Sequence, residues 1–349
     1  MTRQDQRVGE GGQAIQANGD VNINQGLSPD QMLTIMDGVA TQVQRGVERA
    51  ATLVEERLAE FKQAVVEEFS KPETMGRTDA FQDPDFQFAL HEAQKGFARS
   101  GTAELKEELV KLLSQRAAEP DRNRTALILN EAIQTIGNLT KQEIAAISIM
   151  FIFGNLQINN AAGISTVTSM YSNLLNPFFN DLQDENFSYE YLVSMKCAVT
   201  NQFSHSNIWS ILQERYENVF SRGFRGDEIP PGLPADRMGE IVQPIPGAFD
   251  GRMRFAPSNR AELEKVLMDA GIEEGARAPF LTLFDERKLD EHEFQKLFTE
   301  QVPVMGPLVV RWENTLAKST HLTGLGKAIA HSALASRTTF SAPLEIWVK

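Results

Sequence analysis

The chain has 349 residues, of which 42% are hydrophobic and 23% charged, an ordinary globular composition that allows a sizeable core. Its formal net charge of −13 disfavours non-specific binding to nucleic acid or anionic lipid, and it favours solubility and a basic partner. A single cysteine, Cys197, excludes an internal disulfide and a thiolate metal cage and predicts a cytoplasmic protein. Because Cys197 lies in a mostly apolar run, we interpret it as a small buried hydrophobe.

Residues 1–26 are rich in Gly, Gln and Asn and form the first predicted region. Between residues 13 and 24, Ile15, Ala17, Val21 and Ile23 all fall on odd positions, and turn residues occupy 18–20, which is the pattern of a β-hairpin with a three-residue loop. A lone hairpin is marginal in water, so we interpret this segment as an oligomerisation tag, with a disordered tail as the alternative. The candidate oligomerisation residues are Ile15, Ala17, Val21 and Ile23.

Residues 27–70 form the second predicted region, a long amphipathic helix. Ser28 and Pro29 are typical of an N-cap and a first helical position. The apolar positions from Met32 to Phe69 follow a period near 3.6, and a strict heptad would place Gly46 in the seam. We therefore expect a helix docked on a body rather than a sustained left-handed coiled coil. Its many acidic side chains argue against docking on a membrane, which stays an alternative.

Two further helical regions are predicted, a body at 71–220 and a C-terminal region at 258–349. Short connections between consecutive helices favour antiparallel neighbours, as in a bundle. The C-terminal residues 344–349 alternate like a strand, and Trp347 is expected to anchor the chain end to the body. The predicted helices cover 84–99, 102–117, 121–137, 140–158, 161–176, 187–220 (broken), 258–270, 272–287, 289–301, 304–319 and 321–337. The fold class is mainly α, a multi-helical bundle with a long N-terminal helix, a short N-terminal β-type segment and a C-terminal strand.

Between these two regions, residues 221–257 contain six prolines and six glycines and predict a long irregular segment. Five arginines in this segment of an acidic protein form a candidate site for phosphate or an acidic peptide. A solvated loop pinned by its own structure is the alternative. The arginines are Arg222, Arg225, Arg237, Arg252 and Arg254.

A search for reaction chemistry yields no catalytic, cofactor-binding or metal-binding residues. None of the five histidines has a zinc-type partner at close spacing. The sequence Gly324-Leu325-Gly326-Lys327 resembles a phosphate loop only superficially, because Ala328 stands where the motif needs Ser or Thr. These glycines are interpreted as packing or capping residues. The acids near 285–293 do not match the offsets of a calcium loop.

Several stretches of the chain together form a distinctive set. They are AIQANGDVNIN, the long helix after it, DPDFQFALHEAQKGFARSG (83–101), LVKLLSQRA (109–117), LILNEAIQTIGNLT (127–140) and the ending LTGLGKAIAHSALASRT…LEIWVK. In these stretches the chain resembles an uncharacterised family of bacterial cytosolic proteins, and also the sensor component of a jumbo-phage-killing defence system. The resemblance covers most of the chain and is most distinctive in its middle. It transfers no catalytic residues and implies a role in bacterial defence against phage, as a sensor or adaptor beside an effector.

The leading hypothesis is therefore a non-enzymatic interaction protein in anti-phage defence. We expect a homo-oligomer that binds a protein partner, either an effector or a phage component, without a cofactor and without nucleic acid. Two alternatives remain open at this stage. One is an enzyme with an unfamiliar site, such as a nuclease or phosphohydrolase that uses the arginine segment, and the other is a peripheral membrane-binding protein.

Overall fold

The computed structural model describes residues 29–158, 161, 163–201, 203, 205–245 and 251–348. These residues are mainly helical, as the sequence predicts. The chain divides into two compact units, residues 1–55 and 56–349, and helix α1 runs through the boundary. The α-helices are α1 (Pro29–Phe69), α2 (Pro84–Ser100), α3 (Ala103–Arg116), α4 (Arg124–Ile136), α5 (Lys141–Asn155), α6 (Ile164–Phe179), α7 (Phe187–Ser194), α8 (Ile208–Arg215), α9 (Met238–Ile241), α10 (Arg260–Asp269), α11 (Glu274–Glu286), α12 (Glu291–Gln301), α13 (Met305–Asn314) and α14 (Gly324–Arg337).

Short 3₁₀-helices and strands complete the described elements. β1 pairs antiparallel with β4, and β2 pairs antiparallel with β3. The 3₁₀-helices are η1 (Met75–Gln82), η2 (Gly226–Glu228), η3 (Leu316–Ser319) and η4 (Leu344–Ile346), and the strands are β1 (Ala198–Thr200), β2 (Val242–Pro244), β3 (Met253–Phe255) and β4 (Thr320–Leu322). The predicted break within 187–220 is confirmed, because β1 separates α7 from α8.

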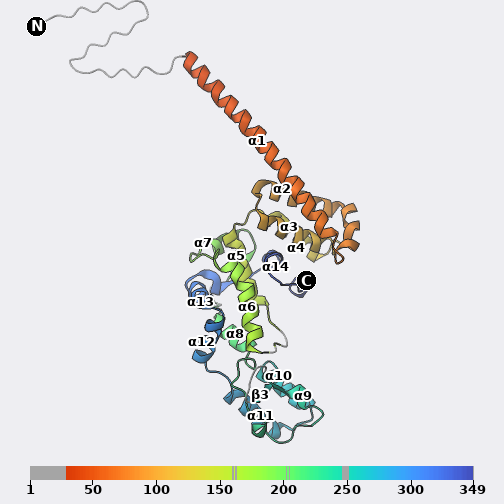
Figure 1. Cartoon of the computed structure of the whole chain (residues 1–349), viewed down its shortest axis with the longest axis vertical. Coiled ribbons are helices and arrows are strands. Elements are labelled where there is room, and N and C mark those ends of the chain that lie inside the picture. Colours follow the sequence, from red (N-terminus) through yellow and green to blue (C-terminus); the bar gives the residue numbers. More distant parts are fainter. Residues whose placement is uncertain are drawn as a thin grey trace, which may run out of the picture. The chain divides into compact units, whose positions relative to one another are not determined.

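Helix α14 is the centre of the main bundle, where it packs against α3, α4 and α5 (Figure 1). Helix α5 is apolar on all sides and is buried from Glu143 to Phe153, which is the pattern of a central helix. It begins at a capping box in which the Glu143 carboxylate accepts the backbone N–H of Thr140 at 2.8 Å. The bundle thus joins helices that lie about 200 residues apart along the chain.

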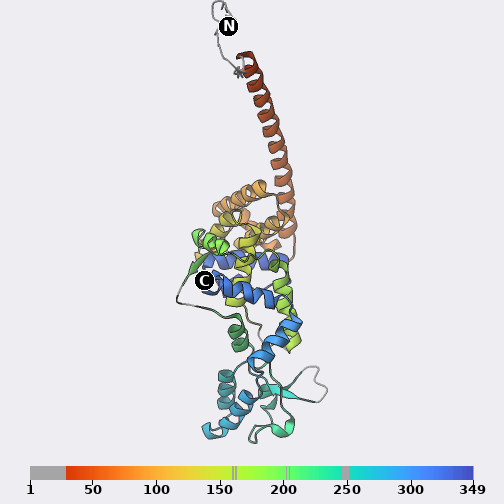
Figure 2. The same ribbon diagram turned by 90° about the vertical axis from the view of Figure 1, so that its left-hand side faces the viewer.

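A second hydrophobic cluster contains residues from the segment that the sequence predicts to be irregular. Phe224, Ile241, Val242 and Phe255 pack with apolar residues of α10 and α11. Figure 2 shows these elements, drawn in teal and light blue, grouped together. The prolines and glycines of 221–257 thus separate short elements, α9, β2 and β3, that share a core with the helices after them.

The predicted C-terminal strand is wrong, since residues 344–346 form the 3₁₀-helix η4. Leu344 and Val348 are buried and Ile346 between them is 57% exposed, and among the described strands only β1 with β4 and β2 with β3 are paired. The anchoring role of Trp347 is confirmed. Its Nε1–H donates to the carbonyl of Asn155 at 2.9 Å, and its ring packs against Phe151.

Candidate functional site

The apolar stripe of α1 is buried in one part of the helix and exposed in the other. Phe61, Val65 and Phe69 are buried in the main core, so the expected docking is confirmed for this part. The earlier apolar residues are 38–61% exposed. We name as the exposed stripe Met32, Met36, Val39, Val43, Val47, Ala50 and Val54.

The apolar residues of α1 have a regular spacing that the comparison with a seven-residue repeat did not reveal. From Met36 to Phe69 the stripe advances by three, four and four residues, and this sequence of steps then repeats. The repeat is 11 residues long, which gives about 3.67 residues per turn and keeps the stripe almost straight along an α-helix. A search for an 11-residue repeat would have found this signal in the sequence.

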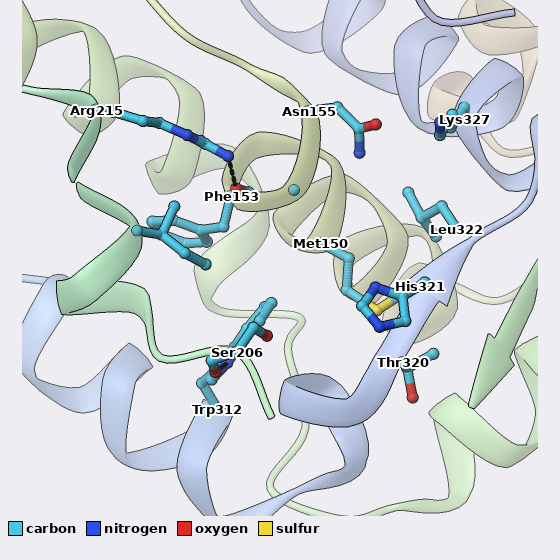
Figure 3. Close-up of a pocket in the computed structure, with 12 residues that line it drawn as sticks. Met150, Phe153, Asn155, Ser206, Arg215, Trp312, Thr320, His321, Leu322 and Lys327 are labelled. Carbon is cyan, nitrogen blue, oxygen red and sulfur yellow. Dashed lines mark hydrogen bonds between the residues drawn. The ribbon is translucent and has the colours of Figure 1, made fainter. Parts of the chain in front are cut away.

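A pocket of about 310 Å³ lies where the end of α5 meets β4 and the start of α14 (Figure 3). Arg215 of α8 reaches it and donates to the carbonyls of Phe153 and Leu156 at 2.5 and 2.7 Å, which neutralises the C-terminal end of α5. Trp312 forms part of the wall and is fixed by its Nε1–H, which donates to the carbonyl of Ser206 at 2.8 Å. The lining residues are Met150, Phe153, Gly154, Asn155, Ser206, Ile211, Arg215, Trp312, Thr320, His321, Leu322 and Lys327.

The lining of this pocket is cationic although the chain is acidic. Arg215 and Lys327 contribute to it, and none of the twelve described lining residues carries a carboxylate. In Figure 3 the side-chain amide of Asn155 lies between Arg215 and Lys327. The pocket therefore presents positive charge and an amide beside an apolar wall, which is the donor set of an anion-binding site.

The glycines before Lys327 have a packing role, as predicted. A Cβ at Gly326 would lie 2.0 Å from the carbonyl oxygen of Cys197, so this position requires glycine for the close approach of α14 to that backbone. Thr323 caps α14 by accepting the N–H of Gly326 at 3.2 Å. Sequence reasoning missed Lys327 as a pocket residue, because most of the other lining residues, Asn155 and Arg215 among them, lie more than 100 positions away along the chain.

The five arginines of 221–257 occupy different surroundings. Arg222 forms ion pairs with Asp290 (3.7 Å) and Glu293, and Arg252 lies beside it, donating to the Arg222 carbonyl at 2.8 Å. Arg225 is exposed, and Arg237 forms an ion pair with Glu240 at 2.7 Å.

Arg254 is the one of these arginines that lies in the interior, only 2% exposed. It donates to the carbonyl of Ala161 at 2.7 Å, and burial lowers its pKa. The structure thus brings Arg222 and Arg252 together and places Arg237 and Arg254 elsewhere. Binding of an anionic partner by all five remains a prediction.

Other titratable groups have internal roles. Burial raises the pKa of Cys197 to about 12, which fits its interpretation as a buried hydrophobe. His331 is buried between the side chain of Gln115 (2.9 Å) and the carbonyl of Ala342 (2.7 Å), and burial lowers its pKa. Within the described residues, no group of three or more His, Cys, Asp or Glu is placed to hold a metal ion.

Comparison with known proteins adds the family. The described structure is a helical scaffold with an exposed apolar helix stripe and a cationic pocket. A family model of uncharacterised proteins matches residues 26–348, and the chain belongs to this family. No curated protein and no solved structure matches the chain.

None of the described helices is both long and apolar enough to cross a membrane. The predicted tag residues Ile15, Ala17, Val21 and Ile23 lie outside the described residues.

Proposed function

We propose that this protein is a non-enzymatic interaction protein of bacterial anti-phage defence, a cytoplasmic sensor or adaptor that self-associates and binds a protein partner. The observation that carries the self-association is the exposed stripe of α1. A contiguous apolar surface of this length on a charged protein is typical of a protein–protein contact. The role in defence rests on the resemblance of the sequence to phage-defence sensors.

The exposed part of α1 needs a partner to be a stable helix. Helices in water gain most of their stability from packing an amphipathic face. This stretch has poor intrinsic propensity, because it contains Gly38 and Gly46 and several β-branched residues. Burial of the exposed half of each stripe side chain contributes roughly 1 kcal/mol per residue, and such a gain offsets the weak propensity.

A second copy of the same helix fits the exposed stripe. The 11-residue repeat keeps the stripe on one side over the whole exposed length, so two or more copies can pack along it without a strong supercoil. The small residues Ala40 and Ala51 adjoin the stripe and allow a close approach of helices.

The charges beside the stripe favour parallel copies. Asp37, Glu48 and Glu55 each come directly after a stripe residue. Because successive residues of an α-helix are turned by about 100° around its axis, these three acids lie on the same flank of the stripe. The opposite flank carries no acid over this length: Ile35, Gln42, Gly46 and Leu53 are uncharged, and Arg49 is basic. Parallel helices place the acidic flank of one copy against this acid-free flank of the next, whereas an antiparallel pair would bring acid against acid. The acidic flank also disfavours an anionic lipid surface as the occupant.

Light scattering on the full chain tests self-association. We expect the wild type to have a mass that is a multiple of 38.9 kDa, and the double variant Val43→Glu, Val47→Glu to have the mass of one chain. The matched control Thr41→Glu, Thr52→Glu adds the same charge on the opposite face of the helix and keeps the wild-type mass. An equal mass for all three proteins would refute association through the stripe. Co-sedimentation of wild type with anionic liposomes, lost in the stripe variant, would assign the stripe to a membrane instead.

Single cysteines test the orientation, because the native Cys197 is buried. In parallel copies, Met36→Cys meets its own counterpart and forms an intermolecular disulfide on oxidation. Antiparallel copies centred on the stripe would place Met36 opposite Ala50, so the single variant would not cross-link. Arg49→Cys, about 120° around the helix from the centre of the stripe, is the control that stays reduced in a parallel assembly.

Two further experiments separate the remaining parts of the proposal. Deletion of residues 1–26 removes the predicted tag, and a mass intermediate between wild type and monomer would show that tag and helix both contribute.

Phage plating on cells that carry the native gene neighbourhood tests the role in defence. We expect the stripe variant, and not its control, to lose protection. Unchanged plating after deletion of the gene would refute the role in defence and leave self-association standing.

A further inference from the structure

The cationic pocket of the body is a site that the proposed self-association does not use. Its lining residues come from five elements and the segment before α8, which the fold assembles around the end of α5 (Figure 3). We propose that this pocket binds a small phosphate-bearing ligand.

The charge of the pocket supports an anionic ligand. Lys327 and Arg215 bring two positive side chains to a cavity whose described lining has no acid, in a chain with an excess of thirteen negative charges. Lys327 is half-buried and lines the cavity, so its side chain belongs to the pocket wall. Arg215 is held in position by the carbonyls of Phe153 and Leu156.

The neutral groups of the pocket support a phosphate that carries an organic part. Asn155 supplies an amide that can donate to a phosphate oxygen, and His321 on β4 supplies a further ring nitrogen. Trp312 and Phe153 pack edge to face, with ring centroids 5.8 Å apart, and provide an apolar wall. A volume of about 310 Å³ is at the lower end of the range for small-molecule sites.

Calorimetric titration of the full-length wild type tests the proposal with three probes, namely inorganic phosphate, adenosine monophosphate and adenosine. We expect saturable binding of the two phosphates and none of adenosine. Tighter binding of the monophosphate than of inorganic phosphate would assign a role to the apolar wall. Equal binding would limit the site to the phosphate group. Absence of saturable binding of either phosphate up to millimolar concentration would overturn the proposal.

Variants locate the binding in this pocket. Lys327→Gln removes one positive charge and is expected to weaken phosphate binding at least tenfold, whereas Lys327→Arg keeps most of it. Lys95→Gln, on α2 and outside the lining, is the matched control and binds as wild type. Circular dichroism of each variant confirms folding. Wild-type affinity in Lys327→Gln would refute the site, and unchanged binding in the Val43→Glu, Val47→Glu variant would show that the pocket works without self-association.

Discussion

The two parts of α1 carry the same repeat in different surroundings. In both, apolar residues recur by three, four and four positions. From Phe61 onward the stripe is covered by the body, where Phe61 stacks on Phe97 with ring centroids 5.7 Å apart. From Met32 to Val54 it is exposed. The repeat therefore specifies which side of the helix is to be covered, while the covering surface comes from other parts of the chain or from another molecule.

Truncating one stripe side chain in each part of α1 should give the largest difference in the free energy of unfolding. Phe61→Ala leaves a cavity in the core and should lower the free energy of unfolding by about 3–5 kcal/mol. Val43→Ala should change it by less than about 0.5 kcal/mol, because Val43 is not part of the core of the body. Urea unfolding followed by tryptophan fluorescence measures this in the body, since all three tryptophans lie after residue 56. Equal losses in the two variants would contradict the assignment of the two parts.

The buried carboxylate of Glu108 shows how burial in the body changes the pKa of a charged group. Glu108 is 2% exposed and pairs with Arg337 at 2.6 Å, yet burial dominates and raises its pKa from 4.5 to about 7. The folded state therefore binds a proton more tightly than the unfolded state, and this group's contribution to stability falls as pH rises from about 4.5 to about 7. The loss is about 3 kcal/mol in total.

Glu108→Gln removes this titration and keeps an acceptor for Arg337. The stability of the variant relative to wild type should rise by about 3 kcal/mol between pH 4.5 and pH 8, measured by urea unfolding at each pH. Glu48→Gln, on the exposed part of α1, is the control and should show no such trend. Parallel pH profiles for wild type and Glu108→Gln would contradict the raised pKa.

Replacing a glycine by alanine should change the stability less, and with opposite sign in the body and in the exposed part of α1. Gly326→Ala forces a methyl group against the carbonyl of Cys197 and should destabilise the body by about 1–3 kcal/mol. The measurement is urea unfolding followed by tryptophan fluorescence. An unchanged free energy of unfolding would show that α14 can move away from Cys197 at no cost.

The smallest effect concerns Gly38 in the exposed part of α1. A Cβ at this position meets nothing within 4 Å, and Gly38 lies on the face away from the stripe. Gly38→Ala should therefore stabilise the helix by about 0.5–1 kcal/mol, with a rise in helical circular dichroism on thermal scans. Destabilisation would indicate that another chain packs closely on this face.

Much of the fold could be predicted because its signals are local. The capping box of Thr140 and Glu143 fixes where α5 begins, and Asp83 before Pro84 does the same for α2. The strand predicted at 344–349 failed because alternation alone does not supply a paired neighbour, and the chain end is instead held by contacts of Trp347 with distant residues. The exposed stripe was present in the sequence as an 11-residue repeat, and comparison with the heptad alone hid it.

The sequence by itself determined that the chain is mainly helical and which side of α1 is apolar, because caps and periodicity act over a few residues. Some helix ends were predicted wrongly: the stop predicted at 176 is wrong, because α6 continues through Pro177 to Phe179. The tertiary structure decided which apolar sides are covered. It also decided that Lys327, Arg215 and Asn155, drawn from three distant segments, line one pocket. The physical reason is that burial and electrostatic surroundings depend on neighbours in space. Here those neighbours are set by the packing of α14 against α3, α4 and α5, which lie far before it in the sequence.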